Sequence, residues 1–254
     1  MSFRIPIPQE LKVISHSELS AEVIIEGLYP GYGISIGNAM RRVLVSSLPG
    51  AAITSFRITG VPHEFSTLPG VIEDVVEISL NLKRVRLKIF SDEAVELTLK
   101  AKGEGEIKAG DIVKNPSAEI INPAAHLLTI TEKSVGLEMI LRAERGIGYL
   151  PVELRKKEKL PIGEIALDAF FNPVTKANFQ VENMRVGERT DYNRLRLTVE
   201  TDGTLDPLAA IRDASAILMD HFAPFGTLPT GEGTVEQDAT VKLAKKTRKK
   251  KSAK

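Results

Sequence analysis

The residues that could carry out chemistry are thinly spread along this chain of 254 residues. It has no cysteine, and its four histidines form neither a His-x-x-x-His nor a His-Glu-x-x-His pair. Zinc sites in proteins are built largely from Cys and His ligands at short, regular spacings. We therefore predict no metal site and no bound cofactor. The histidines are His16, His63, His126 and His221.

A glycine-rich stretch, Gly31–Gly37, has the look of a phosphate-binding loop. The backbone N–H groups at the start of a helix bind anions, and such loops exploit this. However, Gly-x-Gly-x-x-x-Gly has one residue more than a dinucleotide loop, and no Gly-Lys-Ser or Gly-Lys-Thr follows it. We expect these glycines to serve packing. The alternative function is a small enzyme that binds a phosphorylated substrate at Gly31–Gly37.

Glu73 and Asp74 are adjacent acids that could serve acid–base chemistry or hold magnesium. Neighbouring residues on a helix point in different directions, so the two carboxylates do not easily share one site. Acids do stabilise the first turn of a helix, because its dipole is positive there. We therefore expect a solvated helix start, and no catalytic residue in the chain.

The glycine-rich stretch leads into a short amphipathic helix, expected at Ser35–Leu48. Arg41 and Arg42 are about 100° apart on such a helix, so at least one of them points away from its apolar stripe. Pro49-Gly50 is expected to end the helix and to take the turn that follows. The stripe is formed by residues at i, i+4, i+7 and i+8, namely Ile36, Met40, Val43 and Leu44.

A second amphipathic helix is expected to begin at Asp206-Pro207. Aspartate is a favoured N-cap, and proline fits the first helical position because it needs no hydrogen bond there. Apolar spacings of 3, 4, 3, 4 and 3 are typical of a helix that packs along another helix. The pattern alone fits either a helix on its own sheet or a subunit interface. The residues are Leu208, Ile211, Ser215, Leu218, Phe222 and Phe225.

Strand patterns fill most of the remaining chain. After Gly50 we expect a strand, a helix and then a hairpin, whose strands Val85–Ile89 and Val95–Leu99 are joined by a turn at Ser91–Glu93. A polar stretch, Gly187–Asn193, is expected to separate two later strands. Other alternating stretches are Ala21–Glu26, Leu137–Ala143, Phe179–Val181 and Leu195–Val199.

Composition is that of a globular protein, with 43% apolar and 26% charged residues. The first residues lack the basic region and apolar core of a signal peptide, and no apolar run approaches the roughly 18 residues of a membrane span. The absence of cysteine fits a reducing compartment. We expect a cytoplasmic protein with no membrane partner.

Charge is strongly asymmetric along the chain. The formal net charge is +1, but residues 242–254 carry eight Lys or Arg and no acid, which leaves −7 for residues 1–241. An acidic body disfavours a free-standing DNA-binding protein. Residues 229–254 are expected to be a disordered tail that either binds nucleic acid nonspecifically or is merely an unstructured terminus. The candidate cations are Lys245, Lys246, Arg248, Lys249, Lys250 and Lys251.

A series of stretches, in order along the chain, resembles the amino-terminal domain of the bacterial RNA polymerase α subunit family. The similarity extends from about Val23 to Phe225. Chance does not explain several matching stretches that occur in the same order. The stretches are Gly37–Gly50, Gly60–Thr67, Glu73-Asp74 with Asn81–Lys83, Arg145–Tyr149, Val181–Asp191 and Thr201–Pro207.

The resemblance implies an α+β fold in two parts. A dimerisation domain with helices on a sheet, residues 1–50 plus 174–228, is interrupted by an inserted, mainly β domain, residues 51–173. It also implies a homodimeric scaffold that nucleates assembly of the β and β′ subunits. Nucleotide addition with magnesium would then belong to those subunits, and contact with DNA to the assembled, nucleoid-associated enzyme or to the basic tail.

The resemblance further implies partner contacts at matching positions. The first and last helices would form the dimer, which agrees with their apolar stripes. The expected dimer residues are Ile36, Met40, Val43, Leu44, Leu208, Ile211, Ser215, Leu218 and Phe222. The expected β contacts are Arg41, Arg42, His63, Glu64 and Lys83, within or near the matching stretches. The expected β′ contacts are Leu167, Asp168, Arg185 and Arg189.

One part of the family pattern is missing. The usual α subunit continues through a linker into a helical carboxy-terminal domain that binds promoter DNA and activators. Here a stretch rich in Gly, Thr and Pro and then the basic tail follow Phe225, so we expect that domain to be absent. The sequence leaves open whether it is naturally lacking or has been removed.

Overall fold

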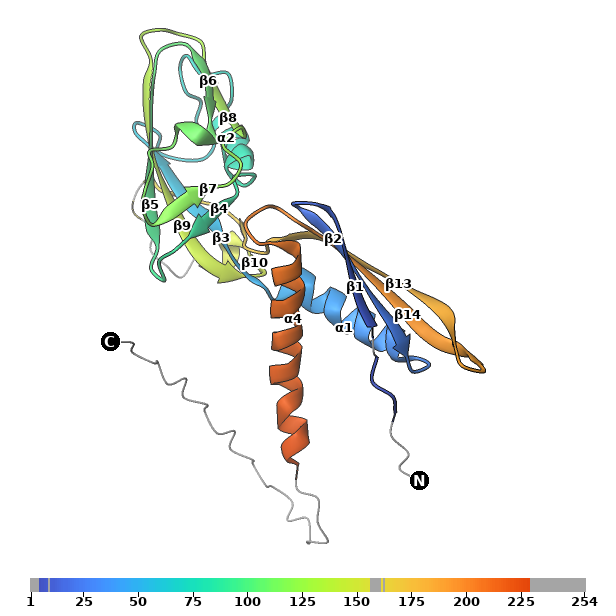
Figure 1. Ribbon diagram of the computed structural model, residues 1–254. Coiled ribbons are helices and arrows are strands. Elements are labelled where there is room, and N and C mark those ends of the chain that lie inside the picture. Colours follow the sequence, from blue (N-terminus) through green and yellow to red (C-terminus); the bar gives the residue numbers. More distant parts are fainter. Residues whose placement is uncertain (1–4, 9, 156–160, 162, 229–254) are drawn as a thin grey trace, which may run out of the picture.

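The computed structural model describes residues 5–8, 10–155, 161 and 163–228, which fold into two units (Figure 1). One unit contains both ends of the described chain, and the middle of the chain forms the other. Each unit has its own hydrophobic core. The arrangement confirms the predicted α+β class with a sheet-rich insert. The boundaries at residues 50 and 174 stay a prediction, and the basic tail lies outside the described residues.

The unit that contains the chain ends is built on a four-stranded antiparallel sheet in the order β1-β2-β14-β13. On β14, Leu195, Leu197 and Val199 are buried and alternate with polar residues, so one face of the sheet is apolar. The strands are β1 (Glu10–Ser17), β2 (Ser20–Leu28), β13 (Val174–Val186) and β14 (Arg189–Thr201).

Helix α1 (Tyr32–Ser46) lies on the apolar face, against β13 and β14. It begins at Tyr32, earlier than the expected Ser35, because Gly31 at the N-cap adopts a left-handed conformation with φ of 87°. A Cβ atom at Gly37 would lie 2.5 Å from Phe179 Cδ2, so glycine allows the helix to approach the sheet closely.

Helix α4 (Pro207–Phe222) begins where the sequence predicts. The Asp206 carboxylate caps it by accepting from the Ala209 N–H group at 2.9 Å. The helix contacts α1 and the sheet with its first half and then continues past them, followed by the short 3-10 helix η2 (Ala223–Thr227) (Figure 1). Among the described helices, none combines the length and apolar character needed to cross a membrane.

The inserted unit is mainly β and packs helix α2 (Val75–Leu82) against its strands. Val75, Ile78 and Leu82 of α2 are buried in its core with residues of the larger sheet. That sheet consists of β11 (Ile165–Ala166), β3 (Pro49–Ile58), β9 (Gly136–Ile147) and β5 (Val95–Lys102), in this order. Smaller elements are β4 (Leu87–Ile89), β6 (Gly105–Lys108), η1 (Ala109–Asp111), β7 (Ala118–Ile120), β8 (His126–Ile130), β10 (Tyr149–Leu150), α3 (Val152–Arg155) and β12 (Ala169–Phe170).

The chain leaves the helix before Pro49-Gly50, as predicted, but these two residues do not form the expected turn. Helix α1 ends at Ser46, and Pro49 and Gly50 already belong to strand β3. Gly50 is paired with Gly146 of β9, and a Cβ atom at Gly50 would lie 1.7 Å from the Phe171 carbonyl oxygen. The glycine is therefore required by close approach of the returning chain rather than by a turn.

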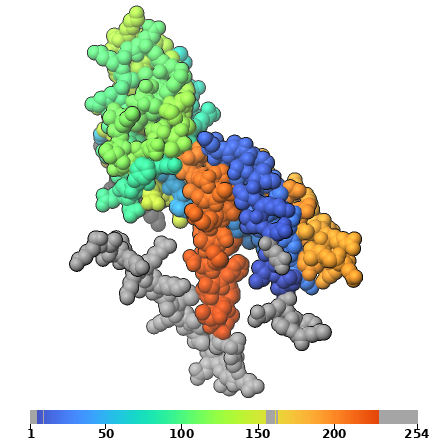
Figure 2. Space-filling model, viewed as in Figure 1, coloured from blue at the N-terminus to red at the C-terminus, as the bar shows by residue number. Residues whose placement is uncertain are grey.

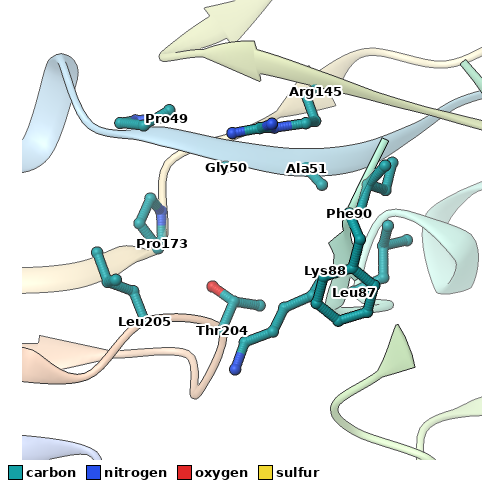
Figure 3. Close-up of a pocket in the computed structure, with 11 residues that line it drawn as sticks. Pro49, Gly50, Ala51, Leu87, Lys88, Phe90, Arg145, Pro173, Thr204 and Leu205 are labelled. Carbon is teal, nitrogen blue, oxygen red and sulfur yellow. The ribbon is translucent and has the colours of Figure 1, made fainter. Parts of the chain in front are cut away.

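A cleft of about 200 Å³ opens beside this junction between the two units. Pro49 and Pro173 line one side of it, and Lys88 and Phe90 line the other (Figure 3). The guanidinium of Arg145, which also reaches the cleft, forms an ion pair of 2.9 Å with the exposed Asp92.

The predicted hairpin of Val85–Ile89 and Val95–Leu99 is wrong. Strand β4 pairs with β7, and β5 pairs with β9. The Ser91–Glu93 segment instead carries the chain from one sheet to another. Alternation of apolar residues reports which face of a strand is buried, and it does not identify the partner strand.

The polar stretch Gly187–Asn193 belongs mostly to strand β14 rather than to a loop. Strands β13 and β14 are joined at Gly187 and Glu188, and Asn183 already pairs with Asn193. Gly187 has a φ of 62°, which a tight hairpin turn requires. Polar residues extend this ribbon because it runs beyond the part of the sheet that α1 covers.

Candidate assembly interface

The glycine-rich stretch at the start of α1 is hydrogen-bonded to a side chain of the same unit. The Asn193 Oδ1 atom accepts from the Gly31 N–H at 2.9 Å and from the Gly33 N–H at 3.4 Å, and Asn193 is buried. A Cβ atom at Gly33 would lie 2.8 Å from Val181. These contacts confirm the packing interpretation. They leave no structural support for the alternative function as a phosphate-binding enzyme, because Asn193 occupies the helix N-terminus.

The expected dimer residues of α1 divide by burial. Leu44 has no exposed surface and Met40 is 8% exposed, so both belong to the core of their own unit. The expectation that Leu44 touches a partner chain is therefore corrected, because its side chain packs in the core between α1 and the sheet. Ile36 and Val43 are half-buried at the edge of that core.

Helix α4 buries a different stripe from the one that the spacing suggests. Ala210 and Ala214 are fully buried, and these small residues allow α4 to cross α1 closely. Ile211, Ser215 and Leu218 are half-buried. Other apolar side chains, mostly on the second half of the helix and on η2, are exposed. They are Leu208 at 36%, Met219 at 63%, Phe222 at 62% and Phe225 at 70%.

Arg42 points away from the apolar stripe, as the helix geometry predicts. It is exposed, and among the described residues it forms no ion pair. Arg41 is half-buried, and its Nη2 atom donates to Asn38 Oδ1 at 3.1 Å within the same helix. Of the two arginines, Arg42 is therefore the one available to a partner.

Two residues expected to contact different subunits form a pair with each other. The Lys83 Nζ atom, at the end of α2, donates to Asp168 Oδ2 at 2.8 Å. Asp168 Oδ1 also accepts from the Val152 N–H group at 3.0 Å. The bond from Lys83, with that N–H group, holds the pKa of Asp168 below its ordinary value. Leu167 is 2% exposed, so the expectation that its side chain contacts β′ is corrected.

The loop that contains His63 and Glu64 lies against the start of α2. The Ser66 carbonyl oxygen accepts from the Val75 N–H group at 3.4 Å, and His63 Nδ1 is 3.2 Å from Ser66 Oγ. Both His63 and Glu64 are exposed. This loop, the segment that follows it and α2 also carry exposed apolar side chains that the sequence did not single out. On α2 the exposed positions are those outside its buried stripe. The exposed apolar side chains of the three segments are Phe65, Ile72, Val76 and Leu80.

Comparison of the sequence with known proteins gives matches that extend over both units. The family described as RNA polymerase Rpb3/RpoA insert domain matches residues 56–172, which are the inserted unit. The DNA-directed RNA polymerase subunit alpha of Carboxydothermus hydrogenoformans is 49% identical over 227 residues, covering 87% of this chain and 72% of that protein. This chain belongs to the α subunit family of bacterial RNA polymerases.

Other members of the family give the same result. The α subunit of Roseiflexus castenholzii is 46% identical over 224 residues, covering 87% of this chain and 69% of that protein. The α subunit of Symbiobacterium thermophilum is 43% identical over 227 residues, covering 89% of this chain and 72% of that protein. The chain is thus a subunit of DNA-directed RNA polymerase, and it takes part in transcription within a multisubunit enzyme.

The α subunit does not gather all the expected β′ contacts in one place. Asp168 lies in the inserted unit, whereas Arg185 and Arg189 lie at the turn of the β13–β14 ribbon, which points away from that unit (Figure 1). The Arg185 Nε atom donates to the Gly187 carbonyl oxygen at 2.8 Å. The resemblance therefore groups residues that the fold places in different units.

Arg189 is held firmly at the end of this ribbon. Its Nε and Nη2 atoms donate to the two carboxylate oxygens of Asp191 at 3.0 and 2.7 Å. Its Cζ atom also lies 5.5 Å from the ring centre of Tyr29 and 5.4 Å from that of Tyr192. The bond to Asp191 raises the pKa of Arg189 further above its ordinary value. These contacts give Arg189 a structural role in orienting the ribbon.

Glu73 and Asp74 have different roles at the start of α2. Asp74 is the N-cap and accepts from the Glu77 N–H group at 2.7 Å. Glu73 is not a solvated residue, because its side chain is 13% exposed and accepts from the Thr129 N–H group at 2.6 Å. It also lies 2.7 Å from His126 Nε2, while His126 Nδ1 lies 3.0 Å from Glu106. The sequence did not reveal this network, since its members come from three separate segments.

We expect the stability of the inserted unit to depend on pH through His126. The hydrogen bond with Glu73, together with Glu106, raises the pKa of His126 above 6.5. A raised pKa stabilises the fold fully below the unfolded-state value and loses this effect as pH rises through the folded-state value. The destabilisation caused by His126→Ala should therefore shrink from about pH 6 to about pH 8.5, by about 1 kcal/mol or less.

Urea unfolding of wild type and His126→Ala at both pH values measures this difference. His63→Ala is the matched control, because among the described residues His63 has no carboxylate partner. A destabilisation by His126→Ala that is equal at both pH values, or larger at the higher one, would contradict the prediction.

Proposed function

We propose that this chain forms a homodimer that acts as the scaffold on which the β and β′ subunits of RNA polymerase assemble. The observation that carries the proposal is the end of α4, which continues past α1 and the sheet (Figure 1). Met219 and Phe222 on α4 and Phe225 on η2 are exposed. An apolar helix end of this kind is stabilised when a second chain covers it. A two-fold axis would bring α1 and α4 of both chains together.

The proposed surface for the large subunits lies on the inserted unit and on α1. It includes Arg42, the His63-Glu64 loop, and the Lys83–Asp168 pair, with exposed Val76 and Leu80 on α2 as apolar contacts. Lys83 was expected to contact β and Asp168 to contact β′, yet they lie 2.8 Å apart. A homodimer presents this surface twice, so one copy can bind β and the other β′.

In this scheme the chain supplies no catalytic residue. Nucleotide addition, with its magnesium, belongs to the two large subunits, and DNA is contacted through the assembled enzyme. The basic tail is a second candidate for nucleic-acid contact, but its residues lie outside the described part of the chain.

Size-exclusion chromatography with light scattering, on the chain alone and then with purified β, tests the proposal. The expected mass of the chain alone is about twice 27.8 kDa. Addition of β should give a complex of two chains and one β subunit, which then binds β′. A monomer that does not bind β would contradict the scaffold function.

We expect Arg42→Ala to weaken capture of β and to leave the dimer intact. Arginine is well suited to bind a partner carboxylate or carbonyl, and Arg42 is exposed on the side of α1 away from its own core. Loss of such a contact at an interface typically costs about 2 kcal/mol, or roughly thirtyfold in affinity. Pull-down of β at a series of concentrations measures the affinity.

Arg185→Ala is the control for this variant, because Arg185 is also exposed and is expected to contact β′ instead. If Arg42→Ala instead gave monomers on gel filtration, Arg42 would belong to the dimer interface. Unchanged β affinity would likewise remove it from the β surface.

A further inference from the structure

Strand β1 exposes apolar residues on the same face of the sheet that carries α1. Leu11 lies opposite Ile25 on β2, and Ile25 lies opposite Leu195 on β14. Leu195 in turn packs beneath Gly37 of α1, where an added Cβ would lie 2.9 Å from its side chain. Directly opposed residues share a face, so Leu11 and Val13, two residues on, lie on the helix side.

The two faces of β1 differ in charge. On the face away from the helices the strand carries Glu10, Lys12 and His16, and Lys12 forms ion pairs with Glu10 at 3.4 Å and Glu26 at 3.0 Å. The helix-side positions carry no charge. They are Leu11, Val13 and Ser15, before the register shift between Ser15 and Ser17.

The helices of the same chain leave this uncharged face open. Helix α1 covers β13 and β14, and α4 reaches β14 and β2. Leu11 remains 62% exposed and Val13 47% exposed. An edge strand that stays exposed in water normally carries charge on its outward positions, which limits unwanted association. An uncharged, exposed face beside two helices therefore points to a protein partner.

The end of α4 provides a surface of matching character. Met219 and Phe222 are more than half exposed, on the part of the helix that continues past α1 and the sheet (Figure 1). Both α4 and the two amino-terminal strands lie at the surface in the view of Figure 2. In a two-fold interface each chain offers the same pair of surfaces, so the end of one helix meets the strand of the other twice.

We propose that the helix-side face of β1, at Leu11 and Val13, is part of the dimer interface and is covered by the end of α4 from a second copy of this chain. The inference rests on the proposed homodimer and assigns it a second contact besides the α1–α4 stripe. The reciprocal arrangement buries the exposed apolar residues of both elements.

Lysine substitutions on the two faces of β1 test the proposal. Leu11→Lys and Val13→Lys should raise the dissociation constant of the dimer by about tenfold or more, because a charge would enter a desolvated contact. Ile14→Lys is the matched control, since Ile14 is 42% exposed on the opposite face and lies opposite Glu22. Analytical ultracentrifugation measures the constants, and circular dichroism confirms that each variant is folded.

Disulfide trapping provides an independent measurement, because the chain has no cysteine of its own. A chain with Val13→Cys is mixed with a chain with Met219→Cys and oxidised, and non-reducing gels show whether a covalent heterodimer forms. The same experiment with Leu11→Cys extends the test, and Ile14→Cys is the control. We expect a heterodimer with Val13→Cys or Leu11→Cys and none with Ile14→Cys.

The outcomes separate this inference from the proposed function. If wild type is dimeric while Leu11→Lys and Val13→Lys match Ile14→Lys, and neither position crosslinks, β1 lies outside the interface and the scaffold proposal stands. If wild type is monomeric at every concentration, the scaffold proposal fails and the inference fails with it.

Discussion

Phe222→Glu is expected to be a folded monomer. Phe222 is 62% exposed in the single chain, so its own unit does not depend on it for a core. In the proposed dimer it lies in the interface with the second chain, where an unpaired carboxylate would be desolvated. Such a charge costs several kcal/mol, and about 3 kcal/mol already corresponds to more than a hundredfold weaker dimer.

Leu218→Glu should also weaken the dimer, but for two reasons at once. Leu218 is half-buried against the core of its own unit, so this substitution also lowers the stability of the chain. Phe222→Glu is therefore the cleaner variant. The two together distinguish loss of the interface from loss of the fold.

Light scattering after size exclusion measures the mass, and thermal unfolding shows whether the fold is retained. Phe90→Glu is the matched control, because Phe90 is 65% exposed but belongs to the inserted unit. It should remain dimeric. An unchanged dimer in Phe222→Glu would place the interface elsewhere on the chain.

Local signals in the sequence predict α4 better than they predict its packing. Asp206-Pro207 correctly marks its start because capping depends on a few adjacent residues. The buried stripe is different from the predicted one, since Ala210 and Ala214 make the contact with α1 and count little in an apolar pattern. Which side of an amphipathic helix faces its own core depends on the crossing helix, and spacing alone does not contain that information.

Long-range pairing limits what the sequence can reveal about the sheets and the site. The alternation in β4 and β5 correctly identifies strands, yet their partners β7 and β9 come from other segments. The Lys83–Asp168 pair likewise joins α2 to a loop between two later strands. The family resemblance indicated both residues as partner contacts. It did not indicate that they contact each other, which only the folded structure shows.

Burial, too, depends on residues that are distant in sequence. Leu167 was selected as a partner contact with Asp168, and the fold buries one and leaves the other half-exposed. Glu73 was expected to be solvated like Asp74, but Thr129 and His126 enclose it. In each case adjacent residues have opposite environments because neighbouring side chains point in different directions.

Gly50→Ala is expected to destabilise the protein strongly. Gly50 and Gly146 are directly opposed on β3 and β9, and both face Phe171, where the chain returns from the inserted unit. A Cβ atom at Gly50 would lie 1.7 Å from the Phe171 carbonyl oxygen. This contact is with backbone, so it cannot be relieved by rotating a side chain. Overpacking of this kind costs about 3 kcal/mol.

The effect should reach both units, because the strained segment joins them. The Phe171 N–H group donates to the Gly148 carbonyl oxygen at 2.9 Å, and Phe171 is 4% exposed, so the segment is fixed on several sides. Moving it to admit a methyl group would disturb β9 and the start of β13. We therefore expect a lower urea midpoint together with weaker dimerisation.

Gly136→Ala is the control for this prediction, because it is also in β9 but its added Cβ would have its nearest neighbour at 3.9 Å. It should match wild type or exceed it slightly, since alanine restricts the unfolded chain more than glycine does. Gly146→Ala would instead meet the Phe171 ring at 2.6 Å, so its cost should be smaller than that of Gly50→Ala if the ring can turn aside. Equal midpoints for Gly50→Ala and Gly136→Ala would show that the Phe171 segment yields freely. The close approach at Gly50 would then not be what holds the two units together.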